Sequence, residues 1–220
     1  MPYVLVLYYS LNGSTEKMAK LIGRGVESTG QYEARIRTVP PISSNSESTL
    51  PKVPETGAIY CSEEDLRDCA ALALGSPTRF GNMSAALKYF IDGTGALWIS
   101  GSLIDKPVAT FTSTNSLHGG QETTLLTMAI PMLHHGMIYC GLPYSESDLS
   151  TTQSGGTPYG ASHFAGPEND LDISPEENRL CAALGERLAN LGKKLERKSL
   201  PQTKRVLLNN PLLCLFSWRY

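Results

Sequence analysis

The sequence has little excess charge of either sign and lacks a long hydrophobic run. Lysine and arginine together number 19, against 21 aspartates and glutamates, which leaves a formal net charge of -2. Such a balance gives no reason to expect nucleic acid as a partner of the folded part. No apolar run approaches the roughly 20 residues of a membrane-spanning helix, so we expect no integral membrane segment.

The sequence also lacks the spacings of disulfide frameworks and metal sites. Its five cysteines are scattered, and no two of them form a C-x-x-C pair. None of the four histidines stands in H-x-x-x-H or H-E-x-x-H spacing, and no G-x-S-x-G elbow appears. We therefore expect reduced thiols and no metal, and we do not expect a Ser/His/Asp hydrolase. The first apolar run follows Pro2 directly, without the charged and apolar regions of a signal peptide. We therefore expect no signal peptide and a cytoplasmic protein.

Short apolar runs are present, and they alternate with stretches of helical periodicity. The runs Tyr3–Tyr9, Cys69–Gly75 and Pro107–Ser113 are typical of strands buried on both faces of a parallel sheet. The weaker runs Ala34–Val39 and Met137–Leu142 are predicted as two further strands.

Between these runs, apolar residues recur at the spacing of one helix face. The last predicted helix opens with Ser174-Pro175-Glu176-Glu177, a capping box with proline at the first helical position. Pro40–Pro54 and Ser150–Gly166 lack periodicity, so we expect no helix or strand in either. The predicted helices are Thr15–Ser28, Ser62–Arg67, Met83–Gly93, Gln121–His135 and Ser174 to Leu195.

This alternation predicts an α/β fold, a five-stranded parallel sheet with helices on both faces. A chain of 220 residues suits one such domain, which we place at residues 1–198. Residues 199–220 form a basic and apolar tail with two prolines. We expect this tail to be disordered or loosely packed, and contact with a membrane surface or a partner is the alternative.

Polar loops follow three of the predicted strands, at Ser10–Thr15, Pro77–Asn82 and Ser113–Gly120. Ligands of open α/β sheets bind beyond the carboxyl ends of the strands. The first loop offers hydroxyl donors, a glycine and a helix start, but no lysine or arginine. This combination favours a phosphate monoester over a nucleoside triphosphate with magnesium. An ordinary strand-to-helix turn is the alternative.

The other two loops suit a flat polar ring. Phe80 stands beside the cation Arg79 in an otherwise polar loop, where it forms either a wall for a planar ring or a plug that packs into the core. Small hydroxyl residues and Gly119-Gly120 would let backbone amides approach a heterocycle. A flexible connection is the alternative for this third loop.

Together these segments resemble the WrbA-type NAD(P)H:quinone oxidoreductases, which are flavodoxin-like flavoproteins. Each motif alone is short, but the ordered set is specific, and the similarity extends from Tyr3 to Leu195. The motifs are VLVLYYS with SLNGST, SPTRFGNM, STNSLHGGQET, LHHGM and GGTPYGAS.

The resemblance implies a flavodoxin-like doubly wound fold, with one non-covalent FMN per subunit. NADH or NADPH would be the co-substrate, quinones the acceptors, and a shared pocket would give ping-pong kinetics. It also implies a homotetramer whose active sites borrow residues from neighbouring subunits, with a dimer–tetramer equilibrium left open. A one-electron flavodoxin-type carrier or an FMN-binding interaction protein is the alternative, although such carriers are usually strongly acidic.

The resemblance assigns binding roles to residues but identifies no catalytic acid, base or nucleophile. Asn12 stands where some members carry tyrosine near the nicotinamide, and contact between His118 and FMN is left open. For Trp98 the alternative is an ordinary surface or interface tryptophan. The implied nicotinamide or substrate contacts are Asn12, Trp98 and Tyr144. The implied FMN contacts are Ser10, Leu11, Asn12, Gly13, Ser14, Thr15, Thr78, Arg79, Phe80, Ser113, Thr114, Asn115, Ser116, Leu117, His118, Gly119 and His134.

Overall fold

The computed structural model describes residues 2–42 and 57–196. Its centre is a sheet in which the paired strands are parallel, in the order β2-β1-β3-β4-β5, with β6 also beside β4. This arrangement confirms the predicted α/β fold with a doubly wound parallel sheet. The strands are β1 (Tyr3–Tyr8), β2 (Glu33–Thr38), β3 (Ala71–Pro77), β4 (Pro107–Thr114), β5 (Ile138–Tyr139) and β6 (Gly160–Phe164).

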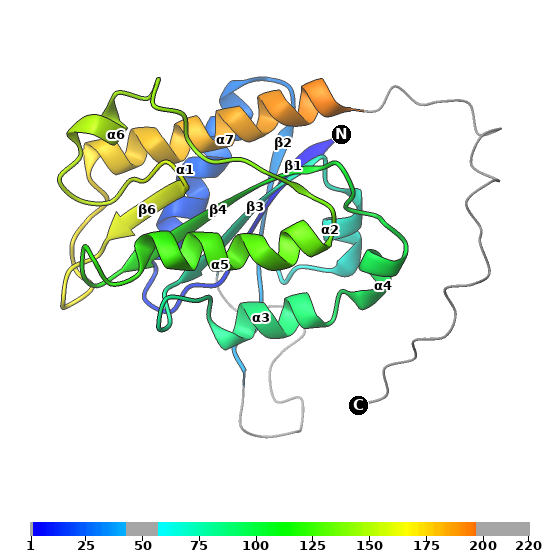
Figure 1. Ribbon diagram of the computed structural model, residues 1–220, viewed down its shortest axis with the longest axis horizontal. Coiled ribbons are helices and arrows are strands. Elements are labelled where there is room, and N and C mark those ends of the chain that lie inside the picture. Colours follow the sequence, from blue (N-terminus) through cyan, green and yellow to red (C-terminus); the bar gives the residue numbers. More distant parts are fainter. Residues whose placement is uncertain (1, 43–56, 197–220) are drawn as a thin grey trace.

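Helices cover both faces of the sheet (Figure 1). On one face α1 and α7 lie side by side over one apolar cluster, and on the other α3 and α5 cover a second cluster. The helices are α1 (Ser14–Ser28), α2 (Glu63–Asp68), α3 (Ala85–Asp92), α4 (Gly95–Ile99), α5 (Gln121–His134), α6 (Asp148–Thr151) and α7 (Pro175–Leu195).

The strand β1 shows why an apolar run without polar interruptions was expected to lie in the middle of the sheet. Val4 and Val6 face the cluster under α1 and α7, whereas Leu5 and Leu7 face the cluster under α3 and α5. All four side chains are buried. Successive residues of a strand point to opposite faces, so both faces of β1 must be apolar.

The edge beside β4 differs from the prediction. The expected strand Met137–Leu142 is reduced to β5, which pairs only with Pro107 and Val108. Beyond that point β6 takes over and pairs with Thr110–Thr114, although Ser150–Gly166 was expected to hold no strand. The sequence signal was weak because Ser162 and His163 of β6 are polar, and they are buried through hydrogen bonds rather than apolar contacts.

Both helix starts predicted from serine caps are confirmed, at Ser62 before α2 and Ser174 before α7. The expected helix Met83–Gly93 is shorter, and α4 follows it as a separate turn. The tail 199–220 and most of the loop Pro40–Pro54 lie outside the described residues.

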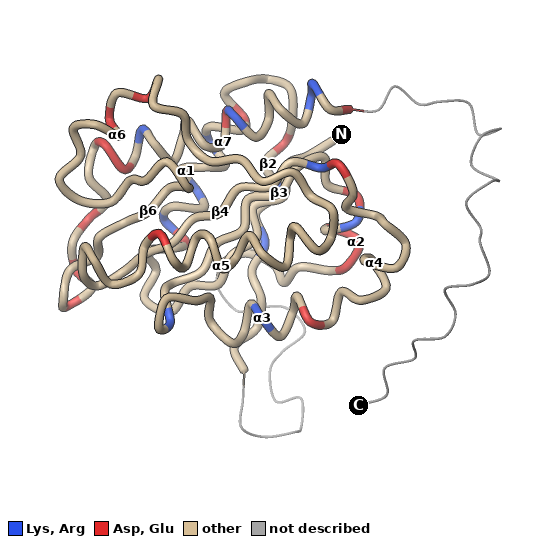
Figure 2. Tube along the Cα trace, viewed as in Figure 1, with Lys and Arg blue, Asp and Glu red and all other residues tan. Residues whose placement is uncertain are grey.

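Charged residues of both signs are interspersed over the chain (Figure 2). The exception is the segment of α4 and α5, since α4 contains no Asp, Glu, Lys or Arg and α5 contains only Glu122. Within residues 2–42 and 57–196, no helix is both long and apolar enough to cross a membrane.

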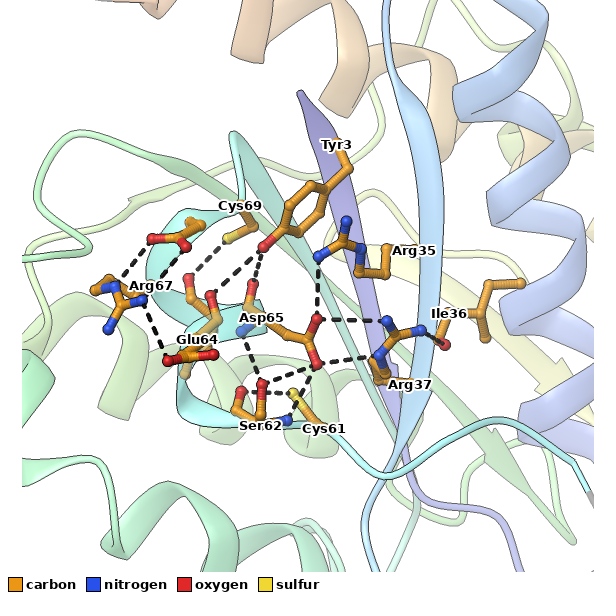
Figure 3. A network of polar contacts seen from close by, with 12 residues as sticks. Tyr3, Arg35, Ile36, Arg37, Cys61, Ser62, Glu64, Asp65, Arg67 and Cys69 are labelled. Carbon is orange, nitrogen blue, oxygen red and sulfur yellow. Dashed lines mark hydrogen bonds and ion pairs between the residues drawn. The ribbon is translucent and has the colours of Figure 1, made fainter. Parts of the chain in front are cut away.

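A polar network ties the edge strand β2 to α2 (Figure 3). The Asp65 carboxylate accepts from Arg35 Nη1 at 3.1 Å and from Arg37 Nε at 3.0 Å, and it also caps the start of its own helix through Ser62. Burial alone would raise the pKa of Asp65, but the hydrogen bonds from Ser62 and Arg37 together hold it below its ordinary value. The network therefore fixes α2 to the edge strand β2 of the sheet.

Candidate functional site

The three predicted loops meet at the carboxyl ends of β1, β3 and β4. These strands are neighbours and parallel, so their carboxyl ends fall at one edge of the sheet. The loops enclose a hollow of about 140 Å³. Its lining residues are Ser10, Leu11, Asn12, Ser14, Thr15, Pro77, Thr78, Arg79, Ser113, Asn115 and Asn169.

The first loop presents an open helix start to this hollow. Gly13 stands at the N-cap of α1 with φ of +87°, and no side chain caps the helix. The Gly13 N–H donates to Ser10 Oγ at 3.1 Å, which fixes the turn. The amides of the first helical turn are left for an external acceptor, and the positive end of the helix dipole adds to their attraction for an anion.

The second loop holds an aromatic side chain in a strained and exposed position. Arg79 and Asn82 exchange backbone hydrogen bonds of 2.7 and 3.0 Å, and the residues between them, Phe80 and Gly81, have φ of +54° and +76°. Positive φ is costly for a bulky residue. The Phe80 side chain is fully exposed, so the interpretation of Phe80 as a plug of the core is wrong. Arg79 also borders an adjoining hollow of about 570 Å³ beside the start of α3.

The third loop is held by hydrogen bonds to the Ser116 carbonyl. Thr114 Oγ1 donates to the Ser116 carbonyl at 2.8 Å, and the Gly119 N–H donates to the same oxygen at 3.2 Å. Ser113 and Asn115 line the hollow, whereas His118 is not among its lining residues. The loop therefore has a defined shape, unlike the flexible connection considered as its alternative.

Two predicted contacts lie far from this hollow. Trp98 and His134 border a different hollow of about 340 Å³, together with Lys88, Ile130, Pro131 and His135. The 14 residues of α5 separate His134 from the third loop, a distance of about 20 Å at 1.5 Å per residue. Within one subunit, the structure does not bring Trp98 and His134 to the hollow lined by the loop Ser10–Thr15. Tyr144 is exposed on the connection after β5.

Sequence reasoning missed Asn169, which follows β6 and also lines the hollow. Asn169 has φ of +58°, a conformation that asparagine tolerates better than most residues. The only signal in the sequence was the cluster Gly166-Pro167-Glu168-Asn169-Asp170, which predicts a turn. Its position at the site depends on β6, which the sequence did not reveal.

Four cysteines in the described part are free: Cys61, Cys69, Cys140 and Cys181. Burial raises the pKa of Cys69 and of Cys140 to about 11, so both thiols stay protonated and unreactive near neutral pH. Among residues 2–42 and 57–196, no group of three His, Cys, Asp or Glu side chains is arranged to hold a metal ion. The chemistry of the hollow thus depends on hydroxyls, amides and Arg79.

Comparison with known proteins agrees with this geometry. A family model described as NADPH-dependent FMN reductase matches residues 2–148. An NAD(P)H dehydrogenase (quinone) from Syntrophobacter fumaroxidans is 39% identical over 203 residues, which cover 88% of this chain and 98% of that protein. One from Solidesulfovibrio magneticus is 40% identical over 203 residues, covering 87% and 98%.

Among solved structures, the fold is similar to that of a flavodoxin, WrbA-like protein from Agrobacterium tumefaciens. The TM-score is 0.64 over 89% of this chain and 100% of that one, at 22% identity. The resemblance to WrbA-type NAD(P)H:quinone oxidoreductases is therefore confirmed. The chain belongs to the NADPH-dependent FMN reductase family.

Proposed function

We propose that this protein is an FMN-dependent oxidoreductase that passes two electrons from NADH or NADPH to quinones. The observation that carries the proposal is the open start of α1, which faces a hollow lined by three strand-end loops. Family membership and the quinone-reducing relatives support the same function.

The hollow fits the phosphate end of FMN. Ser10, Ser14 and Thr15 line it with hydroxyl groups, and a Cβ added to Gly13 would meet nothing within 4 Å. Arg79 is the cation among the lining residues, which suits a monoester better than a triphosphate. These groups would hold one FMN per subunit without a covalent bond.

FMN, when bound, supplies the chemistry of hydride acceptance from the nicotinamide and electron donation to the quinone. The protein contributes position and polarity. The exposed ring of Phe80 offers a flat apolar wall, and the amides of the loop at Asn115–His118 would donate to the polar edge of the flavin. One open space in front of these residues would receive nicotinamide and quinone in turn, which gives ping-pong kinetics.

We infer further that the active site is completed by a neighbouring subunit of a homotetramer. Trp98 on α4 and His134 on α5 border one hollow, and both helices are poor in charge. His134 lies about 20 Å from the third loop along α5. Exposed apolar side chains surround them, including Ile99, Ile130 and Leu133. Burial of these side chains against another copy would place an aromatic wall from that copy opposite the flavin site.

We also propose a cytoplasmic location. The support is chemical: the four described cysteines are free, and three of them are buried. Thiols of this kind are typical of reducing compartments.

Titration with flavins followed by turnover tests the proposed function. Apoprotein should bind FMN with quenching of flavin fluorescence and should bind FAD much more weakly, because an adenylate extension would collide with the phosphate loop. FMN-loaded protein should then oxidise NADH or NADPH with benzoquinone. Double-reciprocal plots of the initial rate at several benzoquinone concentrations should be parallel lines, as ping-pong kinetics requires. FMN binding without this turnover would favour the electron-carrier alternative.

A further inference from the structure

A chain of hydrogen bonds, buried at its centre, leads from the segment Gly155-Gly156 to the third loop. The Gly156 N–H donates to Ser162 Oγ at 2.7 Å, and Ser162 Oγ donates to Gln121 Oε1 at 2.6 Å. Gln121 Nε2 then donates to Thr114 Oγ1 at 3.1 Å, which in turn donates to the Ser116 carbonyl. Gln121, Ser162 and Thr114 are all buried.

Both ends of this chain fix the orientation of the Gln121 amide. Ser162 Oγ already accepts from Gly156, so its single hydrogen points to the oxygen of Gln121. Thr114 Oγ1 uses its hydrogen on Ser116, so it must receive the amide nitrogen. Each hydroxyl therefore donates once and accepts once, which satisfies its single donor. A buried amide held at both ends is costly to turn or remove.

The chain ends on the atom that shapes the third loop. The Ser116 carbonyl accepts from both Thr114 Oγ1 and the Gly119 N–H, so it closes the turn from Ser116 to Gly119. Gln121 itself is not among the residues that line the flavin hollow. The Gln121 side chain therefore reaches this loop through its hydrogen bond to Thr114.

We propose that Gln121 is a positioning residue for the flavin, which acts through Thr114 to hold the loop Ser113–Gly120 in the shape that binds the ring edge. This inference rests on the proposed FMN function. The hydrogen bonds of Gln121 also join the loop to β6 and to Gly156, which lie on a separate stretch of the chain. The flavin loop is thus held by the strand beside β4 rather than by its own sequence alone.

A double-mutant cycle measured by FMN affinity tests this role. Gln121→Met and Thr114→Val each remove two hydrogen bonds of this chain, and each should weaken FMN binding about tenfold. Because both changes break the same link, the double variant should bind FMN no more weakly than the worse single variant. Thr114→Ser keeps the hydroxyl and should restore affinity to within about twofold of wild type.

Gln31→Glu and Ser162→Ala complete the experiment. Gln31 is exposed and distant, with its amide on Asn190, so Gln31→Glu should leave FMN affinity unchanged. Ser162→Ala leaves Gln121 in place and should still weaken FMN binding several-fold, which keeps the test open if Gln121→Met does not fold. Thermal unfolding of each apoprotein confirms that the titrated material is folded.

The outcomes are distinct. Wild-type protein that binds no FMN would overturn the proposed function itself. Wild-type protein that binds FMN, with single-variant losses that add in the double variant, would overturn the role of Gln121 through Thr114 and leave the function standing. Unchanged FMN affinity in Thr114→Val would also overturn the role of Gln121 and leave the proposed function standing.

Discussion

His163 Nδ1 and Glu177 Oε2 lie 2.7 Å apart, and each side chain is only 1% exposed. The Glu177 carboxylate also accepts the backbone N–H groups of Gly155 at 2.7 Å, Phe164 at 3.0 Å and Ser174 at 2.9 Å. One buried carboxylate therefore joins the end of β6 to the start of α7 and to the Gly155 segment. The loop that carries Asn169 to the hollow at the strand ends begins after Phe164 and ends at Ser174, so both of its ends are held by Glu177.

Glu177→Gln should lower the free energy of unfolding by about 2–4 kcal/mol. Each carboxylate oxygen accepts two hydrogen bonds. The amide nitrogen of the glutamine would therefore face two donors whichever way the side chain turned. Urea denaturation of the apoprotein measures the loss. Glu176→Gln on the same helical turn changes an exposed ion pair with Arg179 and should cost less than about 1 kcal/mol. Equal losses in both variants would contradict this account.

The same carboxylate predicts a dependence of stability on pH. Burial would raise the pKa of Glu177, but the hydrogen bonds from His163, Phe164 and Ser174 outweigh it and hold the pKa below its ordinary value. A lowered folded pKa gives stability that is present above the unfolded pKa, about 4.3 for glutamate. That stability is lost as the pH falls through the folded pKa. The difference in unfolding free energy between wild type and Glu177→Gln should therefore shrink below about pH 4, and a constant difference would argue against the role of the charge.

Phe80→Gly should separate backbone strain from ring binding. Relief of the positive φ at Phe80 should stabilise the apoprotein by about 0.5–1 kcal/mol, after the added chain entropy of glycine is subtracted. Loss of the aromatic wall should weaken FMN binding at the same time. Phe80→Ala removes the ring but keeps most of the strain, so it should lose affinity without gaining stability. Thermal unfolding measures the change in stability, and flavin titration measures the change in FMN affinity. Unchanged FMN affinity in both variants would exclude Phe80 from the flavin site.

Gly13→Ala should damage FMN binding more than it damages the fold. Its φ of +87° disfavours any side chain, and a methyl group at this helix start would hold a phosphate farther from the backbone amides. Gly30→Ala is a matched control, since Gly30 has φ of +64°, open space around its Cβ and a position just beyond the other end of α1. Both variants should lose about 1–2 kcal/mol of stability. If Gly13→Ala retains wild-type FMN affinity, the strand-to-helix loop is an ordinary turn.

Trp98→Ala should weaken quinone turnover much more than FMN binding. An aromatic wall is worth about 1–3 kcal/mol of positioning, which is about tenfold to a hundredfold in kcat/KM, whereas the proposed FMN contacts come from other loops. Trp98→Phe keeps a flat ring and should retain most of the activity. Dilution of wild type until the proposed tetramer dissociates should mimic Trp98→Ala. Isolated subunits that reduce quinone at the full rate would contradict a site shared between copies.

Much of the fold could be predicted from the sequence because its signals are local. The apolar run around Val6 needs both faces of a strand buried, and Ser174 with Glu177 caps a helix through residues three apart. The strand β6 could not be predicted, since Ser162 and His163 are buried by partners on α5 and α7. Asn169 escaped notice for the same reason. The common position of Trp98 and His134 became clear only from the structure, in which both border one hollow.

The most direct test of the central claim is an anaerobic experiment on FMN-loaded protein in two half-reactions. One equivalent of NADH or NADPH should bleach the flavin absorbance near its visible maximum, and one equivalent of benzoquinone should restore it in full. This result would show that one bound FMN accepts two electrons from the nicotinamide and passes them to the quinone. Absence of bleaching by either nucleotide, or a bleached flavin that benzoquinone leaves unchanged, would contradict the proposed function.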